Sequence, residues 1–147
     1  MKKLALLLVA FLLAVVTVQS VAARDIPITF AQLPAKAQAF IKKHFSEANV
    51  ASVWKDTDIL DQDYKVYLND GTQIEFYFNG DWEEVKTHAN NMPAAIIPSG
   101  IAQFVNANYP HTPIYKIQKK LYGYEVELSN GLDLEFNKRG QFLGMDD

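Results

Sequence analysis

The chain has 147 residues, with 14 basic and 17 acidic side chains, a net charge of −3 and no cysteine. A chain of this length forms one domain, or two small ones that share a core. The absence of cysteine excludes disulfide bonds, a thiol nucleophile and a lipid attached through an N-terminal cysteine. Because no long run of Lys or Arg is present, nucleic acid and anionic membrane surfaces are disfavoured as partners.

The first 23 residues have the pattern of a secretory signal peptide. Lys2 and Lys3 precede an apolar run, residues 4–18, and small residues follow it. The run is shorter than the roughly 20 apolar residues that cross a bilayer comfortably, which favours cleavage over an uncleaved anchor. We predict cleavage after Ala23, with Ser20 as the alternative position. The mature protein would then be periplasmic or secreted from a bacterium, with 12 basic and 17 acidic residues.

After a linker at residues 24–27, the sequence predicts a short helical turn and then a longer helix. Pro34 suits the start of that helix, and apolar side chains follow at helical spacing. This apolar stripe consists of Leu33, Ala37, Phe40, Ile41 and Phe45. The same order returns 64 residues later, from Ile97 to Tyr109, where Pro110 ends the second helix.

A stretch of strand-like sequence occurs twice. Residues Tyr64–Trp82 return as Tyr124–Phe142, sixty positions later. The residues of the first copy that recur unchanged are Tyr64, Val66, Leu68, Gly71, Glu75, Phe76 and Gly80. In each copy alternating apolar residues flank a turn that contains glycine, which predicts antiparallel hairpins. A further strand is expected before each copy, at residues 50–55 and 114–119, and the first copy has four extra residues within a loop at 56–63.

Each half of the chain is therefore predicted to form a helix followed by a meander of four antiparallel strands, because the turns are too short for parallel crossovers. We place the first unit at residues 28–89 and the second at residues 90–147. The predicted fold class is α+β: two tandem units that form one continuous sheet, with the helices on one face and the other face open. In the first unit the side chains predicted to face the helices are Val66, Leu68, Ile74, Phe76 and Phe78.

A doubled unit of this kind, with Y-x-V-x-L, x-N/D-G and I/L-E-F-x3-G in each copy, resembles the PepSY-like proteins. These are small exported bacterial proteins grouped with the β-lactamase-inhibitory-protein fold, and the resemblance runs from Ile28 to the C-terminus. It implies an eight-stranded sheet with a concave open face, the surface with which the inhibitor grips its enzyme. It also implies restraint of proteases by some members, with no catalytic residues. Since this sequence lacks the cysteines of that inhibitor, inhibition of β-lactamase is not carried over.

The side chains predicted to lie on the open face differ between the two units. The candidate binding residues are Trp54, Tyr67, Glu75 and Tyr77 in the first unit and Glu125, Glu127 and Glu135 in the second. Exposed rings on a rigid sheet anchor partners because they bury much area at little entropic cost, and carboxylates steer a basic partner. The alternative is that the rings only pair across strands and stabilise the sheet. Trp82 is expected to pack in the core or at its edge.

The loop between the first two strands is the one candidate metal site. Its carboxylates, which could supply part of a calcium shell, are Asp56, Asp58, Asp61 and Asp63. An EF-hand needs an oxygen ligand, a glycine and a glutamate at the positions where this chain has Leu60, Asp61 and Tyr67. We therefore expect a solvated hairpin loop, with calcium binding as the weaker alternative.

The sequence contains no hydrolase, nucleotide-binding or zinc-protease motif. Its three histidines, His44, His88 and His111, lack metal-ligand spacing, so surface roles are expected. We predict a non-enzymatic, cofactor-free exported module that binds an unknown protein or peptide through the open face, with restraint of an extracytoplasmic enzyme implied by the resemblance. The alternative is a carrier of a small ligand or cation that uses the acidic concave face.

Overall fold

The computed structural model describes residues 24–58, 60, 62–88 and 91–146; the predicted signal peptide lies outside these ranges. The strands are β1 (Ile26–Ile28), β2 (Val50–Lys55), β3 (Tyr64–Leu68), β4 (Gln73–Phe76), β5 (Trp82–Lys86), β6 (Ile114–Lys120), β7 (Gly123–Leu128), β8 (Asp133–Asn137) and β9 (Phe142–Asp146). The helices are α1 (Ala35–His44) and α2 (Ser99–Asn108), and the 3₁₀ turns are η1 (Phe30–Gln32), η2 (Glu47–Asn49) and η3 (Ala94–Ile96).

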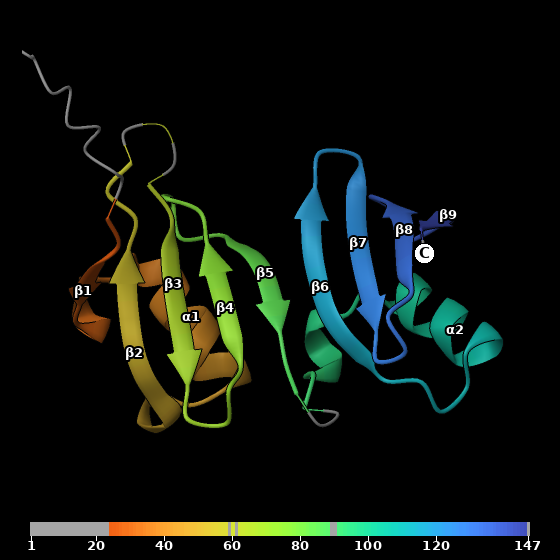
Figure 1. Cartoon of the computed structure of the whole chain (residues 1–147), viewed down its shortest axis with the longest axis horizontal. Coiled ribbons are helices and arrows are strands. Elements are labelled where there is room, and N and C mark those ends of the chain that lie inside the picture. Colours follow the sequence, from red (N-terminus) through yellow and green to blue (C-terminus); the bar gives the residue numbers. More distant parts are fainter. Residues whose placement is uncertain (1–23, 59, 61, 89–90, 147) are drawn as a thin grey trace, which may run out of the picture.

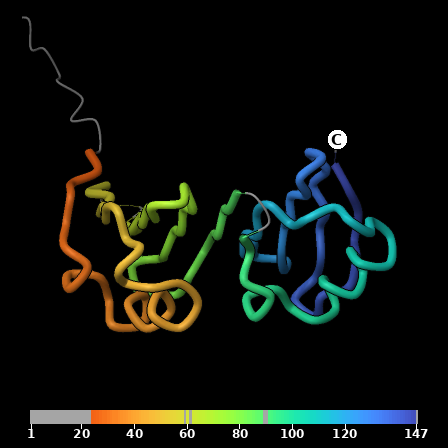
Figure 2. The backbone as a smooth tube through the Cα atoms, turned by 90° about the horizontal axis from the view of Figure 1, so that it is seen from below, coloured from red at the N-terminus to blue at the C-terminus, as the bar shows by residue number. Residues whose placement is uncertain are grey.

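The strands form a single antiparallel sheet in the order β1 to β9, so each strand pairs with the one before it in the chain (Figure 1). Both helices lie on the same side of this sheet (Figure 2). The predicted α+β class with an open antiparallel sheet is confirmed. Apolar side chains of the strands alternate toward the helices and meet Ala37 and Ile41 of α1 and Ile101 and Val105 of α2, all of them buried.

The described residues form nine strands, where the resemblance implied eight. The additional strand is β1, which begins in the stretch predicted to be a linker and ends at the first residue of the predicted first unit, and it pairs with β2 through Ile26–Lys55 and Ile28–Val53. Proline lacks an N–H group, so Pro27 is tolerated because β1 is an edge strand. Ile28 packs partly buried against the core. A strand of three residues with a central proline is too short to show the alternation of apolar and polar side chains. The sequence pattern therefore did not predict it.

Phe78 was predicted to face the core, and this prediction is wrong, because its side chain is 70% exposed. The register between β4 and β5 shifts between Glu75 and Phe76, which marks a β-bulge. Beyond it the backbone turns: the N–H of Gly80 donates to the carbonyl of Tyr77 at 2.9 Å. The alternation of the strand therefore ends at Phe76, and Phe78 lies on the turn.

Candidate binding face

The face opposite the helices consists of side chains that alternate with the core residues, arranged in rows across the sheet. Cross-strand register places in one row Trp54, Lys65, Glu75, Glu84, Gln118, Glu125 and Glu135. The neighbouring row contains Ser52, Tyr67, Gln73, Lys86, Lys116, Glu127, Asp133 and Asp146. All the predicted binding residues except Tyr77 lie in these rows. The rows hold seven carboxylates and three lysines, so this face is acidic.

Two of the predicted aromatic anchors come together at the β1–β3 end of this face. Trp54 and Tyr67 line an open hollow of ≈ 390 Å³ with Ser52 and Asp25. The indole N–H of Trp54 donates to Ser52 Oγ at 3.1 Å, which fixes the ring. Asp25 is 3.2 Å from Lys65 Nζ and forms an ion pair with it. Asp25 was not a predicted site residue, because the segment that carries it was interpreted as a linker.

Tyr77 does not line this hollow. It follows the last residue of β4 and is half-buried. Burial raises the pKa of its hydroxyl, and the carboxylates of Glu83, Asp63 and Asp81 raise it further. The structure therefore separates Tyr77 from the other two predicted rings and places it in an acidic environment.

The centre of the face carries two like charges side by side. Glu75 on β4 and Glu84 on β5 are directly opposite each other. Burial raises the pKa of Glu75, the Glu84 carboxylate raises it further, and Lys65 on the other side opposes the shift. Glu84 was missed at the sequence level, although its position next to the buried Val85 is the signal that could have placed it on this face.

At the far end of the face, lysines from β6 bridge the predicted carboxylates of β7. Lys116 Nζ lies 3.6 Å from Glu125 Oε1 and 3.3 Å from Glu127 Oε2. Lys120 Nζ lies 3.6 Å from the other oxygen of Glu125. The structure thus brings Glu125 and Glu127 together, but as members of an ion-pair network whose charge is partly neutralised.

The β8 part of this end combines a tyrosine with two carboxyl groups. The Tyr122 hydroxyl donates to Glu135 Oε1 at 3.1 Å. Burial and then the Glu135 carboxylate raise the pKa of Tyr122 to about 12. Burial also raises the pKa of Asp133, whose Oδ1 is buried and has no hydrogen-bond partner among the described residues. Of these residues only Glu135 was a predicted site residue.

In the candidate calcium loop two of the described carboxylates, those of Asp56 and Asp58, accept N–H groups of the loop's own backbone. Asp56 Oδ1 accepts the N–H of Asp58 at 2.8 Å, and Asp58 Oδ1 accepts that of Leu60 at 3.2 Å. Asp61 lies outside the described residues, and Asp63 closes the loop through its carbonyl, which accepts the Asp56 N–H at 2.8 Å. Across the described ranges, no three His, Asp or Glu side chains are grouped as metal ligands. Calcium binding by this loop stays a prediction.

The three histidines lie at different places in the chain: at the end of α1, after β5 and after α2. His44 ends α1 with its ring 4.7 Å from that of Phe40, and burial lowers its pKa, as does neighbouring Lys43. The ring of His88 lies 5.4 Å from that of Tyr115. His111 follows α2 with a φ of 67°, a left-handed conformation.

The sequence matches, over residues 19–60 and 62–144, the family described as "Putative beta-lactamase-inhibitor-like, PepSY-like". The chain belongs to the PepSY-like family. The family is described as inhibitor-like and not as catalytic. No curated protein sequence matches this PepSY-like chain.

Solved structures of similar proteins share this fold. A protein of Bacteroides thetaiotaomicron described as a "putative calcium-regulated periplasmic protein" is 38% identical, with a TM-score of 0.77 over 84% of this chain and 97% of its own. A periplasmic protein of Bacteroides vulgatus is 37% identical, with a TM-score of 0.76 over 86% and 99% of the two chains. Another from B. vulgatus, of unknown function, is 34% identical, with a TM-score of 0.78 over 84% and 100%.

All three similar proteins are described as periplasmic, which bears out the predicted periplasmic or secreted location. Within the described part of the chain, none of the helices has the length and apolar character needed to cross a membrane.

Proposed function

We propose that this PepSY-like protein is an exported, non-enzymatic module that binds a protein or peptide on the open face of its sheet. The observation that carries the proposal is the organisation of that face. Both described helices cover the opposite side, and the open side has an aromatic hollow at one end and an excess of carboxylates over the rest. The inhibitor-like description of the family supports restraint of an extracytoplasmic enzyme as the use of this binding.

The two ends of the face would contribute to binding in different ways. The rings of Trp54 and Tyr67 offer contact area beside a hollow, and Trp54 is already held by Ser52, so little side-chain entropy is lost on binding. The acidic remainder raises the association rate of a basic partner more than its final affinity. The partner that fits best is a chain with an apolar side chain for the hollow and Lys or Arg residues beyond it.

The test is affinity capture from the native periplasm or medium with the mature chain, followed by mass spectrometry. The double variant Trp54→Ala, Tyr67→Ala is expected to capture at least tenfold less of the partner, since anchors in such positions contribute about 2 kcal/mol or more each. Phe78→Ala is the matched control, because this ring is exposed on a turn away from the hollow. Equal capture by the double variant and the native chain would refute the proposal.

The restraint of an enzyme has its own readout. If a captured partner is an enzyme, the purified mature chain is expected to slow it in proportion to binding, and the double variant to lose both effects together. An enzyme that is captured but runs at full rate would show that the module binds without inhibiting. The binding proposal would then stand and the inhibitory one would fall.

A calcium-responsive or cation-carrying role is the second candidate, favoured by the description of the B. thetaiotaomicron relative and by the acidic face. A cation that binds only the folded protein must raise its melting temperature. Calcium at millimolar concentration is therefore expected to raise the melting temperature above that in equal magnesium. Asp58→Asn and Glu84→Gln would assign the effect to the loop or to the face, and an unchanged melting temperature would exclude this candidate.

A further inference from the structure

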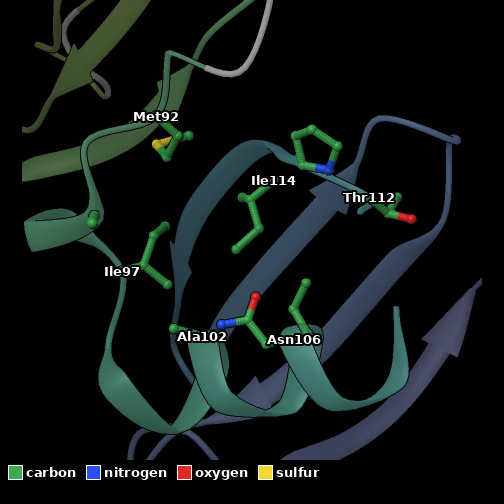
Figure 3. Close-up of a pocket in the computed structure, with 9 residues that line it drawn as sticks. Met92, Ile97, Ala102, Asn106, Thr112 and Ile114 are labelled. Atoms are coloured by element: carbon green, nitrogen blue, oxygen red, sulfur yellow. The ribbon is translucent and has the colours of Figure 1, made fainter. Parts of the chain in front are cut away.

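A separate pocket, partly apolar and partly polar, lies on the helix side of the second half, between η3, α2 and the start of β6 (Figure 3). Its volume is ≈ 210 Å³. The apolar residues that line it include Met92, Ala94, Ile97, Ala102, Val105 and Ile114. The side chain of Asn106 points into the hollow, where its amide offers a hydrogen-bonding group (Figure 3). The pocket is independent of the open face, which lies on the other side of the sheet.

The first half of the chain shows what fills the corresponding space. The turns η1 and η3 start 64 residues apart, at Phe30 and Ala94. Phe30 packs partly buried against the core, and Lys42 Nζ lies 5.7 Å from the centre of its ring. The residue 64 positions after Lys42 is Asn106, which lines the pocket. At the same offset the residue that corresponds to Phe30 is Ala94, which lines the pocket and has no ring to fill it.

A second substitution at the same offset widens the pocket and removes a donor. In the first half Gln38 Nε2 donates to the carbonyls of Ala31 at 3.1 Å and Leu33 at 2.8 Å. The residue that corresponds to Gln38 is Ala102, which has no amide. The wall of the pocket thus lacks a donor that the first half has, beside the carbonyl of Ile97, the counterpart of Leu33.

We propose that this pocket binds a small monocyclic aromatic compound that carries a hydrogen-bond donor, with its ring in the place that Phe30 occupies in the first half. The volume suits one six-membered ring and a few further atoms. Met92, which replaces Ile28 in the second half, brings a thioether to the wall, and sulfur makes favourable contacts with aromatic rings. The donor on the ring takes the part of the Gln38 amide, and the Asn106 side chain offers it an acceptor.

Phenol is the simplest probe of this class. With seven heavy atoms in a pocket that is open on one side, we expect a dissociation constant on the order of a millimolar. In a titration of the ¹⁵N-labelled mature chain with phenol, amide signals of Ala94, Ala102 and Asn106 are expected to shift and saturate. Cyclohexanol, of similar size but without a flat ring, is expected to bind at least threefold more weakly.

Ala94→Phe is the decisive variant, because it copies the residue of the first half into the pocket. We expect it to abolish the phenol-induced shifts. Ala95→Phe is the matched control, since Ala95 is exposed on the same turn and does not line the pocket, and it should leave binding intact. If Ala94→Phe does not fold, Ala94→Leu fills part of the same space and is expected to weaken binding at least threefold.

Three results would overturn the inference. These are the absence of saturable shifts up to about 20 mM phenol, well beyond the expected millimolar range, shifts that persist in both Ala94 variants, and equal binding of cyclohexanol. The first would show that the pocket is only a packing defect, the second that phenol binds elsewhere, and the third that the pocket does not select aromatic rings.

Discussion

The two halves of this molecule follow the same order of a helix and four strands, yet their fourth strands have opposite environments. β5 has β4 on one side and β6 on the other, whereas β9 has β8 as its single neighbour among the described strands. Val85 of β5 is fully buried, and its counterpart Met145 of β9 is 58% exposed. The difference shows that alternation alone does not bury an inward-facing side chain. Its burial depends on the strands that lie on either side of its own strand.

The rings that begin these two strands show the same contrast. Trp82 of β5 stacks on Phe40 at 6.0 Å, and Lys119 Nζ from β6 lies 4.2 Å above its ring. Trp82 therefore packs at the edge of the core, as its sequence counterpart suggested. Phe142 of β9 stacks on Phe104 at 4.4 Å but stays 39% exposed, because β9 is at the edge of the sheet formed by the described strands.

The largest effect is expected when a buried ring is removed from the core of each half. Phe76→Ala and Phe136→Ala each remove a fully buried ring and should cost about 3–5 kcal/mol of unfolding free energy. We expect the larger loss for Phe76, because β5 and β6 hold its surroundings in place, whereas β9 can collapse toward a cavity at Phe136. Urea denaturation of both variants measures the difference. An equal or larger loss for Phe136→Ala would show that the outer strand is as rigid as the inner one.

A turn glycine tests how closely each helix approaches the sheet. Gly80 and Gly140 both have left-handed φ values, of 86° and 77°. A Cβ at Gly80 would lie 2.8 Å from Pro34 Cβ, whereas one at Gly140 would meet nothing closer than 3.5 Å. Gly80→Ala is expected to cost roughly 2–3 kcal/mol and Gly140→Ala about 1 kcal/mol, since only the first adds a clash to the backbone strain. Similar losses in thermal or urea unfolding would contradict this difference in packing.

The next largest effect is expected when side chains of the two fourth strands, β5 and β9, are shortened. Val85→Ala should destabilise the fold by roughly 2 kcal/mol, because it removes two buried methyl groups and leaves a cavity. Met145→Ala should change the unfolding free energy by less than about 0.5 kcal/mol, as for most exposed side chains. A loss of more than about 1 kcal/mol at Met145 would reveal that β9 is covered in solution.

The smallest effect depends on pH and lies on the open face. Because the pKa of Glu75 is raised in the folded protein, its ionised form costs stability above that pKa, and the cost disappears as the pH falls toward the usual value of 4.5. Glu75→Gln is therefore expected to stabilise the fold at pH 7.5 by roughly 0.2–1 kcal/mol and to be neutral near pH 4. Glu127→Gln is the contrast, since it breaks an ion pair with Lys116 and should not stabilise. If the unfolding free energy is the same for Glu75→Gln and the native chain at every pH, this prediction is wrong.

Much of this architecture could be predicted from the sequence, because the fold depends on local patterns. The alternation of Val66, Leu68, Ile74 and Phe76 predicted four buried side chains, and all of them are buried. The prediction that Phe78 faces the core was wrong for a local reason too, since a β-bulge ended the alternation before this residue. A β-bulge depends on how two strands pair, and the sequence of one strand alone does not predict that pairing.

The candidate binding face was less predictable, because it depends on which residues lie opposite one another. Parity placed Trp54 and Tyr67 on the correct face, but only the three-dimensional structure shows that Asp25 lines the hollow with them and that Tyr77 does not. The bridging of Glu125 and Glu127 by Lys116 likewise follows from the pairing of β6 with β7. Sequence alternation gives the face of a residue, and cross-strand register gives its neighbours.

The order of the strands also bears on how this chain acquires its structure. Every strand pairs with the one that precedes it, and the longest interruption is the segment with α2 between β5 and β6. Contacts between residues close in the sequence cost little loop-closure entropy, so such topologies fold rapidly. A chain that emerges N-terminus first from a translocation channel would thus find the partner of each new strand already outside. The first half could be assembled before the second has left the channel, and β9, the last of the described strands, would pair with a sheet that is already formed.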